Sequence, residues 1–258
     1  MVEQQASIGV HRRARFGQTR EGTTEMKQRI SIHESLREGW RIYRQQPVLL
    51  ISGWVLAVLA GYAVQFLVPS YDPTLQSLAI TAAAAPFYAG LQVVALRLLR
   101  QEQADFFDLF TGFLRWGWVV LAALMVTVLV AIAGVLLVVP GLILLIAFLY
   151  VPILVAEGSL SPTSALGASW RVTFGNKVPL FVLAAVFYAI PIVALVAYAV
   201  SLLSAVGAGG PAEVSQEVLI ATYVYSGLQV LFLGPLSSAS FMAAYDQLTR
   251  PIETEGSH

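Results

Sequence analysis

The chain has 258 residues, of which 57% are hydrophobic and only 12% are charged, whereas about 25% of the residues in an ordinary soluble domain are charged. This composition argues strongly against a soluble globular domain of this size, and a formal net charge of zero argues against nucleic acid as a partner. The chain has no cysteine, and its histidines, His11, His33 and His258, lie outside the apolar segments, so we expect no disulfide, no metal site and no cofactor.

Residues 1–29 are polar, basic and without helical periodicity, which predicts a disordered cytoplasmic tail. No apolar run follows this basic region closely enough for a cleaved signal peptide. The basic cluster around Arg12, Arg13 and Arg15 could touch anionic lipid, but a solvated determinant of topology is the favoured interpretation. Residues 251–258 are predicted to form a short second cytoplasmic tail after a membrane domain at residues 30–250.

The first ordered segment begins with Ser31 and Glu34, which have the spacing of a capping box. Apolar residues then recur at helical spacing up to Tyr43, and charged residues fill the opposite face. This pattern predicts an amphipathic helix in the membrane interface, which Pro47 ends. Similar amphipathic segments are predicted at Asp105–Arg115 and after Ser161.

The longest apolar stretch, Trp116–Ala156, contains no Asp, Glu, Lys or Arg. As one helix it would be about twice as long as a bilayer core is thick, so it must fold back, and Val139-Pro140-Gly141 is the expected break. A buried hairpin of a soluble protein is the weaker alternative, because the rest of the chain repeats the pattern. We predict an all-α membrane bundle with six spans, at Val48–Val68, Leu75–Leu99, Trp118–Val139, Pro140–Ala156, Val178–Val206 and Val218–Leu248.

The charges predict the orientation of these spans. Of the fifteen Lys and Arg residues, nine precede the first span, three lie near the end of the second span or between it and the third, two lie between the fourth and fifth spans, and one follows the sixth. The three opposite loops have none. By the positive-inside rule both termini are therefore expected in the cytoplasm.

Short matches suggest an internal repeat of three units, each an interfacial helix followed by a hairpin of two spans. Leu36, Trp40 and Arg41 match Leu166, Trp170 and Arg171 at an offset of 130 residues, and Leu109 with Phe113 forms a weaker middle copy. The second span of each hairpin contains proline. We also expect Gly53, Ala57 and Gly61 to form a small-residue face that contacts another helix.

These features resemble the YciC-like and glycerophosphodiesterase membrane-domain-like group of uncharacterised bacterial membrane proteins. The residues that carry the resemblance are Ser35-Leu36 with Gly39-Trp40, Asp108-Leu109-Phe110 with Gly112-Phe113, the Val139-Pro140-Gly141 turn, and Glu157 with Ser164-Ala165-Leu166 and Ser169. The resemblance covers about residues 31–250 and implies six spans in a bacterial plasma membrane. It implies no activity.

Few residues are candidates for a functional site. The charged or polar positions near or within the spans are Gln65, Gln92, Arg97, Glu157, Gln229 and Asp246, and the candidate interfacial anchors are Trp40, Arg41, Trp170 and Arg171. Arg97 and Asp246 could form an ion pair, although separate solvation is favoured. The glutamines could line a polar path, although hydrogen bonding between helices is favoured.

We found no phosphate loop, catalytic carboxylate pair or hydrolase motif in the chain. The leading hypothesis is a non-enzymatic protein that organises lipid or other membrane proteins, with membrane lipid as a partner and a homo-oligomer possible. A small transporter or permease-like subunit is the alternative. A cavity reaching the midplane and lined by Gln92 and Gln229 would favour transport, whereas a sealed core would favour the first hypothesis.

Overall fold

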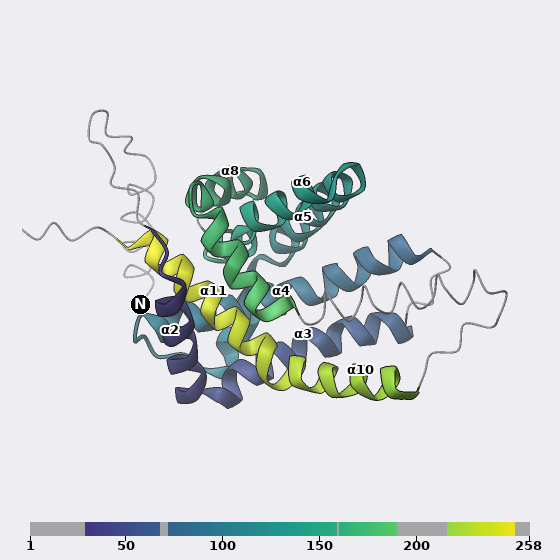
Figure 1. The fold of residues 1–258 in the computed structure, drawn as a ribbon, viewed down its shortest axis with the longest axis horizontal. Coiled ribbons are helices and arrows are strands. Elements are labelled where there is room, and N and C mark those ends of the chain that lie inside the picture. Colours follow the sequence, from purple (N-terminus) through teal and green to yellow (C-terminus); the bar gives the residue numbers. More distant parts are fainter. Residues whose placement is uncertain (1–28, 68–71, 159, 190–215, 251–258) are drawn as a thin grey trace, which may run out of the picture.

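In the computed structural model, the described residues are 29–67, 72–158, 160–189 and 216–250 (Figure 1). Within these ranges the regular structure is entirely helical, and five helices are long and apolar enough to cross a membrane, or six with one bent pair. The predicted all-α, multi-pass membrane bundle is therefore confirmed. The two predicted tails, apart from Arg29, and the second half of the predicted span Val178–Val206 lie outside the described residues.

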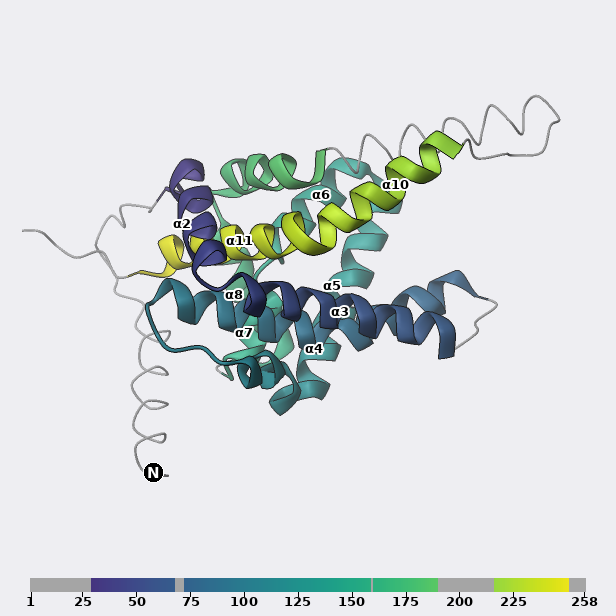
Figure 2. The ribbon, with the colours of Figure 1, turned by 90° about the horizontal axis from the view of Figure 1, so that it is seen from below.

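The first unit consists of α2 (Ile32–Gln45), α3 (Pro47–Leu67) and α4 (Pro73–Leu99), and α3 and α4 lie side by side (Figure 2). The predicted small-residue face of α3 is confirmed, because Gly53, Ala57 and Gly61 are all buried. A Cβ atom on Gly61 would lie 3.2 Å from Ile80 of α4. Small side chains thus bring the two spans into close contact.

The second unit begins with the 3₁₀ helix η1 (Phe106–Arg115) and continues with α5 (Trp116–Leu136), α6 (Val138–Ala147) and α7 (Val151–Ala156). The predicted break near Pro140 is present, since Leu137 has an extended backbone conformation. The predicted span Pro140–Ala156 is confirmed, since Val139–Ala156 is long and apolar enough to cross a membrane, but a turn at residues 148–150 divides it into α6 and α7. Pro152 lies in the first turn of α7, where its missing N–H leaves no bond unmade.

The third unit consists of α8 (Pro162–Thr173), a helix at Lys177–Ala189, α10 (Gln216–Leu228), the π-helix η2 (Gln229–Leu233) and α11 (Gly234–Thr249). Gly175 has φ +79°, which supports the predicted stop after α8, and the chain turns by 95° into the next helix. The predicted break at Gly234-Pro235 coincides with the end of η2.

The π-helix has a physical cause in Pro235, which cannot donate to the carbonyl four residues before it and clashes with it. That carbonyl belongs to Leu231, and it accepts a hydrogen bond of 2.9 Å from the hydroxyl of Tyr43. A side chain of α2 thereby replaces the missing backbone donor, as burial in a membrane requires.

The second spans of the three units meet at the centre of the bundle. Tyr150, fully buried just before α7, donates to the carbonyl of Phe241 and packs its ring 4.9 Å from that of Tyr245, both on α11. Leu91 of α4 and Leu154 of α7 are also buried in this core. The centre is therefore filled with side chains rather than open.

In each interfacial helix, the residue that packs on this centre lies three positions after the leucine of the repeat. These residues are Gly39, Gly112 and Ser169, which follow Leu36, Leu109 and Leu166. A Cβ atom on Gly39 would lie 2.8 Å from the Cα of Ser240 in α11, and one on Gly112 would lie 2.8 Å from the carbonyl carbon of Pro86 in α4. Ser169 donates a hydrogen bond of 2.7 Å to the carbonyl of Ala147, at the end of α6. Each interfacial helix thus packs on the second span of the preceding unit, which supports the predicted repeat.

This arrangement closes into a ring, because α2 of the first unit packs across α11 of the third (Figures 1 and 2). We call the end of the bundle that carries α2, the end of α11 and the ionic side chains of the spans the charged end. The opposite end, where the tips of the α3–α4 hairpin and the start of α10 lie, is called the far end.

Candidate functional site

A cluster of ionic side chains joins the second spans at the charged end. Asp246 of α11, with only 4% of its side chain exposed, lies 3.3 Å from Nε of Arg100 and 2.6 Å from Nη2 of Arg250. A further contact of 3.9 Å joins Arg100 Nη1 to Glu157 Oε1, just after α7. One arginine at the end of α4 therefore links the ends of all three inner helices.

The ion pair between Arg97 and Asp246 considered from the sequence does not form, and neither group is separately solvated. Arg97 instead pairs with Asp108 of η1 at 2.5 Å. Arg97 and Arg100 lie about one turn apart on the same side of α4, but at different heights, so that Arg97 reaches η1 whereas Arg100, one residue past the end of α4, reaches α11. Asp108 also accepts a 2.9 Å hydrogen bond from the backbone N–H of Asp105 and so stabilises the start of η1.

The predicted capping box at Ser31 is present only in part. The Ser31 hydroxyl accepts a hydrogen bond from the backbone N–H of Glu34, as expected. The backbone N–H of Ser31, however, donates at 3.0 Å to the side-chain amide of Gln247 on α11 rather than to Glu34. The start of α2 is thereby attached to the last span.

The predicted anchors Trp40 and Trp170 have similar exposures, 40% and 37%. Trp40 stacks on Tyr43 at 5.7 Å and contacts Phe232, and Trp170 lies under the ammonium group of Lys177 at 3.4 Å. Arg41 donates to Glu38 at 2.8 Å, and Arg171 is exposed. Each tryptophan ring is therefore partly covered by other side chains and partly exposed at the protein surface.

The two inner glutamines do not line a shared path among the described residues. Gln229 accepts a hydrogen bond of 2.7 Å from Tyr225, one turn earlier in the same span. The side-chain oxygen of Gln92 is buried without a hydrogen-bond partner. Neither residue borders the cavity of about 470 Å³ that lies between the first two hairpins.

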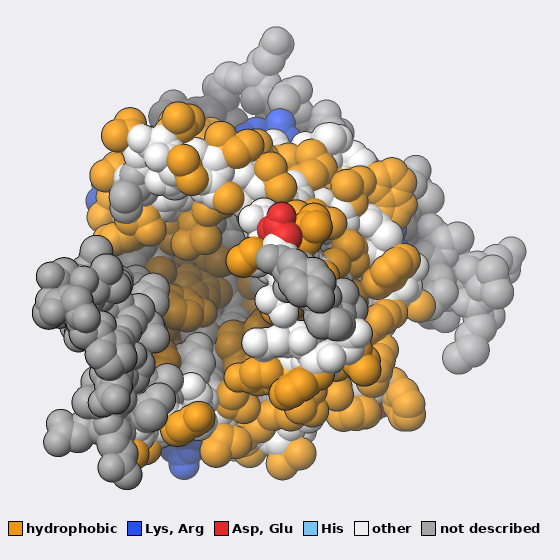
Figure 3. Space-filling model, turned by 90° about the vertical axis from the view of Figure 1, so that its right-hand side faces the viewer, with side chains coloured by type: hydrophobic (Ala, Val, Ile, Leu, Met, Phe, Trp, Pro, Cys, Tyr) orange, Lys and Arg blue, Asp and Glu red, His pale blue; other side chains and the backbone are white. Residues whose placement is uncertain are grey.

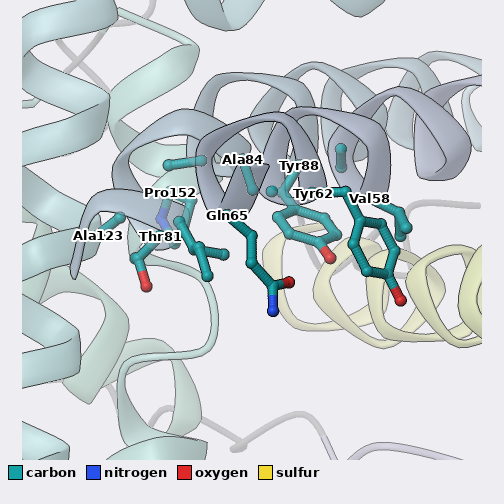
Figure 4. A pocket seen from close by; sticks show the side chains of 12 residues that line it. Val58, Tyr62, Gln65, Thr81, Ala84, Tyr88, Ala123 and Pro152 are labelled. Carbon is teal, nitrogen blue, oxygen red and sulfur yellow. The ribbon is translucent and has the colours of Figure 1, made fainter. Parts of the chain in front are cut away.

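A cavity of about 470 Å³ lies between the first two hairpins. We call it the lateral cavity; α3 and α4 supply most of its walls, and Ala123 of α5 and Pro152 of α7 close it on the other side. The side chains of Tyr62, Gln65 and Tyr88 project into it with their polar ends on the same side (Figure 4). The far end of the bundle, seen in Figure 3, is mainly hydrophobic and hollowed beside its centre.

Among the described residues, the lining of the lateral cavity carries no charge. It consists of Ala57, Val58, Gly61, Tyr62, Gln65, Ile80, Thr81, Ala84, Ala85, Tyr88, Ala123 and Pro152. Gln65 is one of the glutamines predicted as possible lining residues, whereas Tyr62, Thr81 and Tyr88 were not predicted. Their spacing held a signal, because Tyr62 and Gln65 are three residues apart and Thr81 and Tyr88 are seven apart, so each pair shares one helix face.

The far-end start of α4 is held by Asp72, whose carboxylate accepts hydrogen bonds from the backbone N–H groups of Thr74, at 2.7 Å, and Leu75. These bonds favour the ionised form and lower the pKa of Asp72 below its usual value. The cap fixes where α4 begins and so the depth at which Thr81 and Tyr88 lie along it.

A second, polar cavity of about 390 Å³ lies at the charged end, between α2 and α11, and is bordered by Glu38, Arg41, Asp246 and Arg250. Within the described ranges, no three acidic or histidine side chains gather in a way that could hold a metal ion. In comparisons with known proteins, no family model, curated protein or solved structure matches this chain.

Proposed function

We propose that this multi-pass membrane protein is non-enzymatic and organises membrane lipid by holding a lipid in the lateral cavity. The observation that carries the proposal is the form of that cavity: an apolar space at membrane depth with a few uncharged polar groups on one side. Ligand sites commonly combine mainly apolar walls with a small number of placed polar groups, in volumes of about 300–1,000 Å³.

The filled centre of the bundle supports lipid binding over solute transport. Behind the cavity, the inner helices α4, α7 and α11 are packed through buried side chains such as Leu91, Leu154 and Met242. At the charged end, Arg100 ties the same three helices together. A lipid tail can enter the lateral cavity from the bilayer without any path through this core.

A small transporter or permease-like subunit is the second candidate, and the interrupted spans favour it. The turn between α6 and α7 and the π-helix before α11 are irregular segments of the kind that line transport sites. This candidate requires water to reach the buried side-chain oxygen of Gln92 in some conformation of the protein.

The lipid proposal is tested by filling the cavity. Ala123→Trp places a large ring in the cavity, and Ala131→Trp places the same ring on an exposed position of the same helix. We expect lipid retained by the purified protein, quantified by mass spectrometry, to fall only in Ala123→Trp. Equal retention in both variants would exclude the lateral cavity as the lipid site.

The two candidates are separated by labelling, which the absence of native cysteine makes simple. Single-cysteine variants Gln92→Cys and Gln65→Cys are exposed to a membrane-impermeant maleimide from both sides of sealed vesicles. The lipid proposal expects no labelling at Gln92→Cys, with Gln65→Cys as the accessible control. Labelling of Gln92→Cys would support a transport path instead.

The proposed setting is a bacterial plasma membrane with both termini in the cytoplasm, as the charge distribution and the family resemblance suggest. The described part of the chain is consistent with this orientation, because Arg97, Arg100 and Arg250 lie together at the charged end. Membrane lipid is the proposed partner, and contact with other membrane proteins or a second copy follows as an extension of the organising role.

A further inference from the structure

We infer that the lateral cavity selects a lipid whose polar part is uncharged, with hydroxyl, ester or carbonyl groups, and rejects one that carries a bare phosphate. This inference rests on the proposed function and names the chemical class of its ligand. Three observations support it: the uncharged polar groups that line the cavity, their depth along α3 and α4, and the position of the charged side chains.

The polar groups of the cavity are two phenol hydroxyls, an aliphatic hydroxyl and a carboxamide, from Tyr62, Tyr88, Thr81 and Gln65. The phenols and the carboxamide can both donate and accept hydrogen bonds, and the Thr81 hydroxyl, which donates to the carbonyl of Ser77 at 2.9 Å, can still accept one; this set suits hydroxyl and carbonyl groups. Among the described lining residues there is no Lys, Arg or His to neutralise a phosphate. A phosphate held here would therefore remain an unpaired charge.

The polar groups of the cavity lie at different depths along α3 and α4. Gln65 lies two residues from the far end of α3, whereas Thr81 and Tyr88 lie about 12 Å and 22 Å along α4 from its start at Pro73. The last of these depths is well inside a hydrocarbon layer of about 30 Å. Hydroxyl and ester groups can be satisfied there by single hydrogen bonds, but a phosphate without a counter-charge would carry a desolvation cost of several kcal/mol.

Among the described residues, no cation borders the cavity. Arg97 and Arg100 follow Thr81 by 16 and 19 residues, about 24 Å and 28 Å along α4, and follow Tyr88 by 9 and 12 residues, about 14 Å and 18 Å; both are already paired with acidic side chains. Arg115 lies beside α7, where its Nη1 is 3.4 Å from the carbonyl oxygen of Val155, three residues after the lining residue Pro152. Arg97 and Arg100 cannot extend to the far half of the cavity. The charge distribution thus separates an ionic end from an uncharged ligand site on one helix.

A further polar group lies behind the cavity wall. Tyr88 packs edge-on against Trp54 of α3, with ring centroids 5.1 Å apart, and the indole N–H of Trp54 is buried without an acceptor. Tyr88→Phe keeps this ring contact and removes only the hydroxyl. It is therefore a suitable variant for testing the ligand contact without disturbing the packing.

The test compares two lipids with identical chains, dioleoylglycerol and dioleoylphosphatidic acid, which differ only in hydroxyl against phosphate. Binding to the full-length protein in detergent is measured by native mass spectrometry and by the shift of the unfolding temperature. We expect dioleoylglycerol to bind and to raise the unfolding temperature, and dioleoylphosphatidic acid to do neither. The double variant Gln65→Leu with Tyr88→Phe should weaken dioleoylglycerol binding about tenfold, because two hydrogen bonds are lost.

Tyr223→Phe is the matched control, since Tyr223 is 73% exposed on α10 and borders neither cavity; it should leave binding unchanged. Equal or stronger binding of dioleoylphosphatidic acid would overturn the selectivity while leaving lipid binding intact. If neither lipid binds and Ala123→Trp retains as much lipid as Ala131→Trp, both the selectivity and the proposed function fail.

Discussion

Arg100 and Asp246 are separated by 146 residues, yet the guanidinium Nε lies 3.3 Å from the carboxylate Oδ1. The pair joins the end of the first hairpin to the end of the last span, and Arg250 holds the second carboxylate oxygen at 2.6 Å. Because only 4% of the Asp246 side chain is exposed, water cannot replace either partner fully. The contact therefore closes the ring of three units at the charged end.

Asp246→Asn should destabilise the protein by about 1–3 kcal/mol, because hydrogen bonds to a buried charged group are lost and Arg100 loses its nearest partner. The partly exposed pair of Arg41 and Glu38 provides the control. Glu38→Gln should cost less than about 1 kcal/mol, because this pair is much more accessible to water than Asp246. Thermal unfolding in one detergent measures both, and equal effects would mean that burial does not strengthen the Asp246 contacts.

Ala57→Leu should loosen the contact between α3 and α4, because Ala57 is only 1% exposed and its longer replacement must either push the helices apart or occupy the lateral cavity that Ala57 borders. We expect a loss of about 1–3 kcal/mol. Ala63→Leu, on an exposed position of the same helix, should have little effect. An unchanged unfolding temperature for Ala57→Leu would contradict a close contact between α3 and α4 at this position.

Gly112→Ala should be strongly destabilising, since its Cβ atom would collide with the backbone of Pro86 in α4. We expect the free energy of unfolding to fall by about 1–3 kcal/mol or more, as overpacking a close contact usually causes. Gly117→Ala lies just beyond η1, and its Cβ atom would meet no described neighbour within 4 Å. That control should be neutral or stabilising by about 0.5–1 kcal/mol. Similar unfolding temperatures for the two variants would contradict the close packing of η1 on α4.

Tyr43→Phe should cost about 1 kcal/mol, because it leaves the carbonyl of Leu231 without its side-chain donor. The structural cause can be checked with Pro235→Ala, which restores a backbone N–H able to reach that carbonyl. In the Pro235→Ala background the cost of Tyr43→Phe should shrink, as a double-mutant cycle would reveal. An identical cost in both backgrounds would mean that the contribution of the Tyr43 hydrogen bond to stability does not depend on Pro235.

The predicted orientation is open to a direct test with a reporter that is active only in the cytoplasm. Fusion at His258 should give a signal, and insertion within residues 207–210 should give none, because the charge-free loops are expected outside. The opposite pattern would mean that either the number of spans or the orientation is wrong.

The sequence by itself determined the class of fold and the approximate limits of the spans. Long apolar runs such as Trp116–Ala156 have few alternatives to membrane helices, because only lipid can cover so much apolar surface. The same reasoning located the interruptions near Pro140 and Pro235, since proline disrupts a helix by local chemistry. The small residues Gly53, Ala57 and Gly61 predicted a close helix contact for an equally local reason.

Only the tertiary structure decided which distant groups meet. Arg97 and Arg100 lie about one turn apart on the same side of α4, so the sequence does not distinguish their partners. The packing of η1 and α11 around that end of the helix pairs one arginine with Asp108 and the other with Asp246. The lateral cavity likewise combines Tyr62 and Gln65 of α3 with Thr81 and Tyr88 of α4, and with Ala123 and Pro152 of the next unit. Periodicity gives the face on which each side chain lies, but the rotation and crossing of the packed helices decide what that face meets.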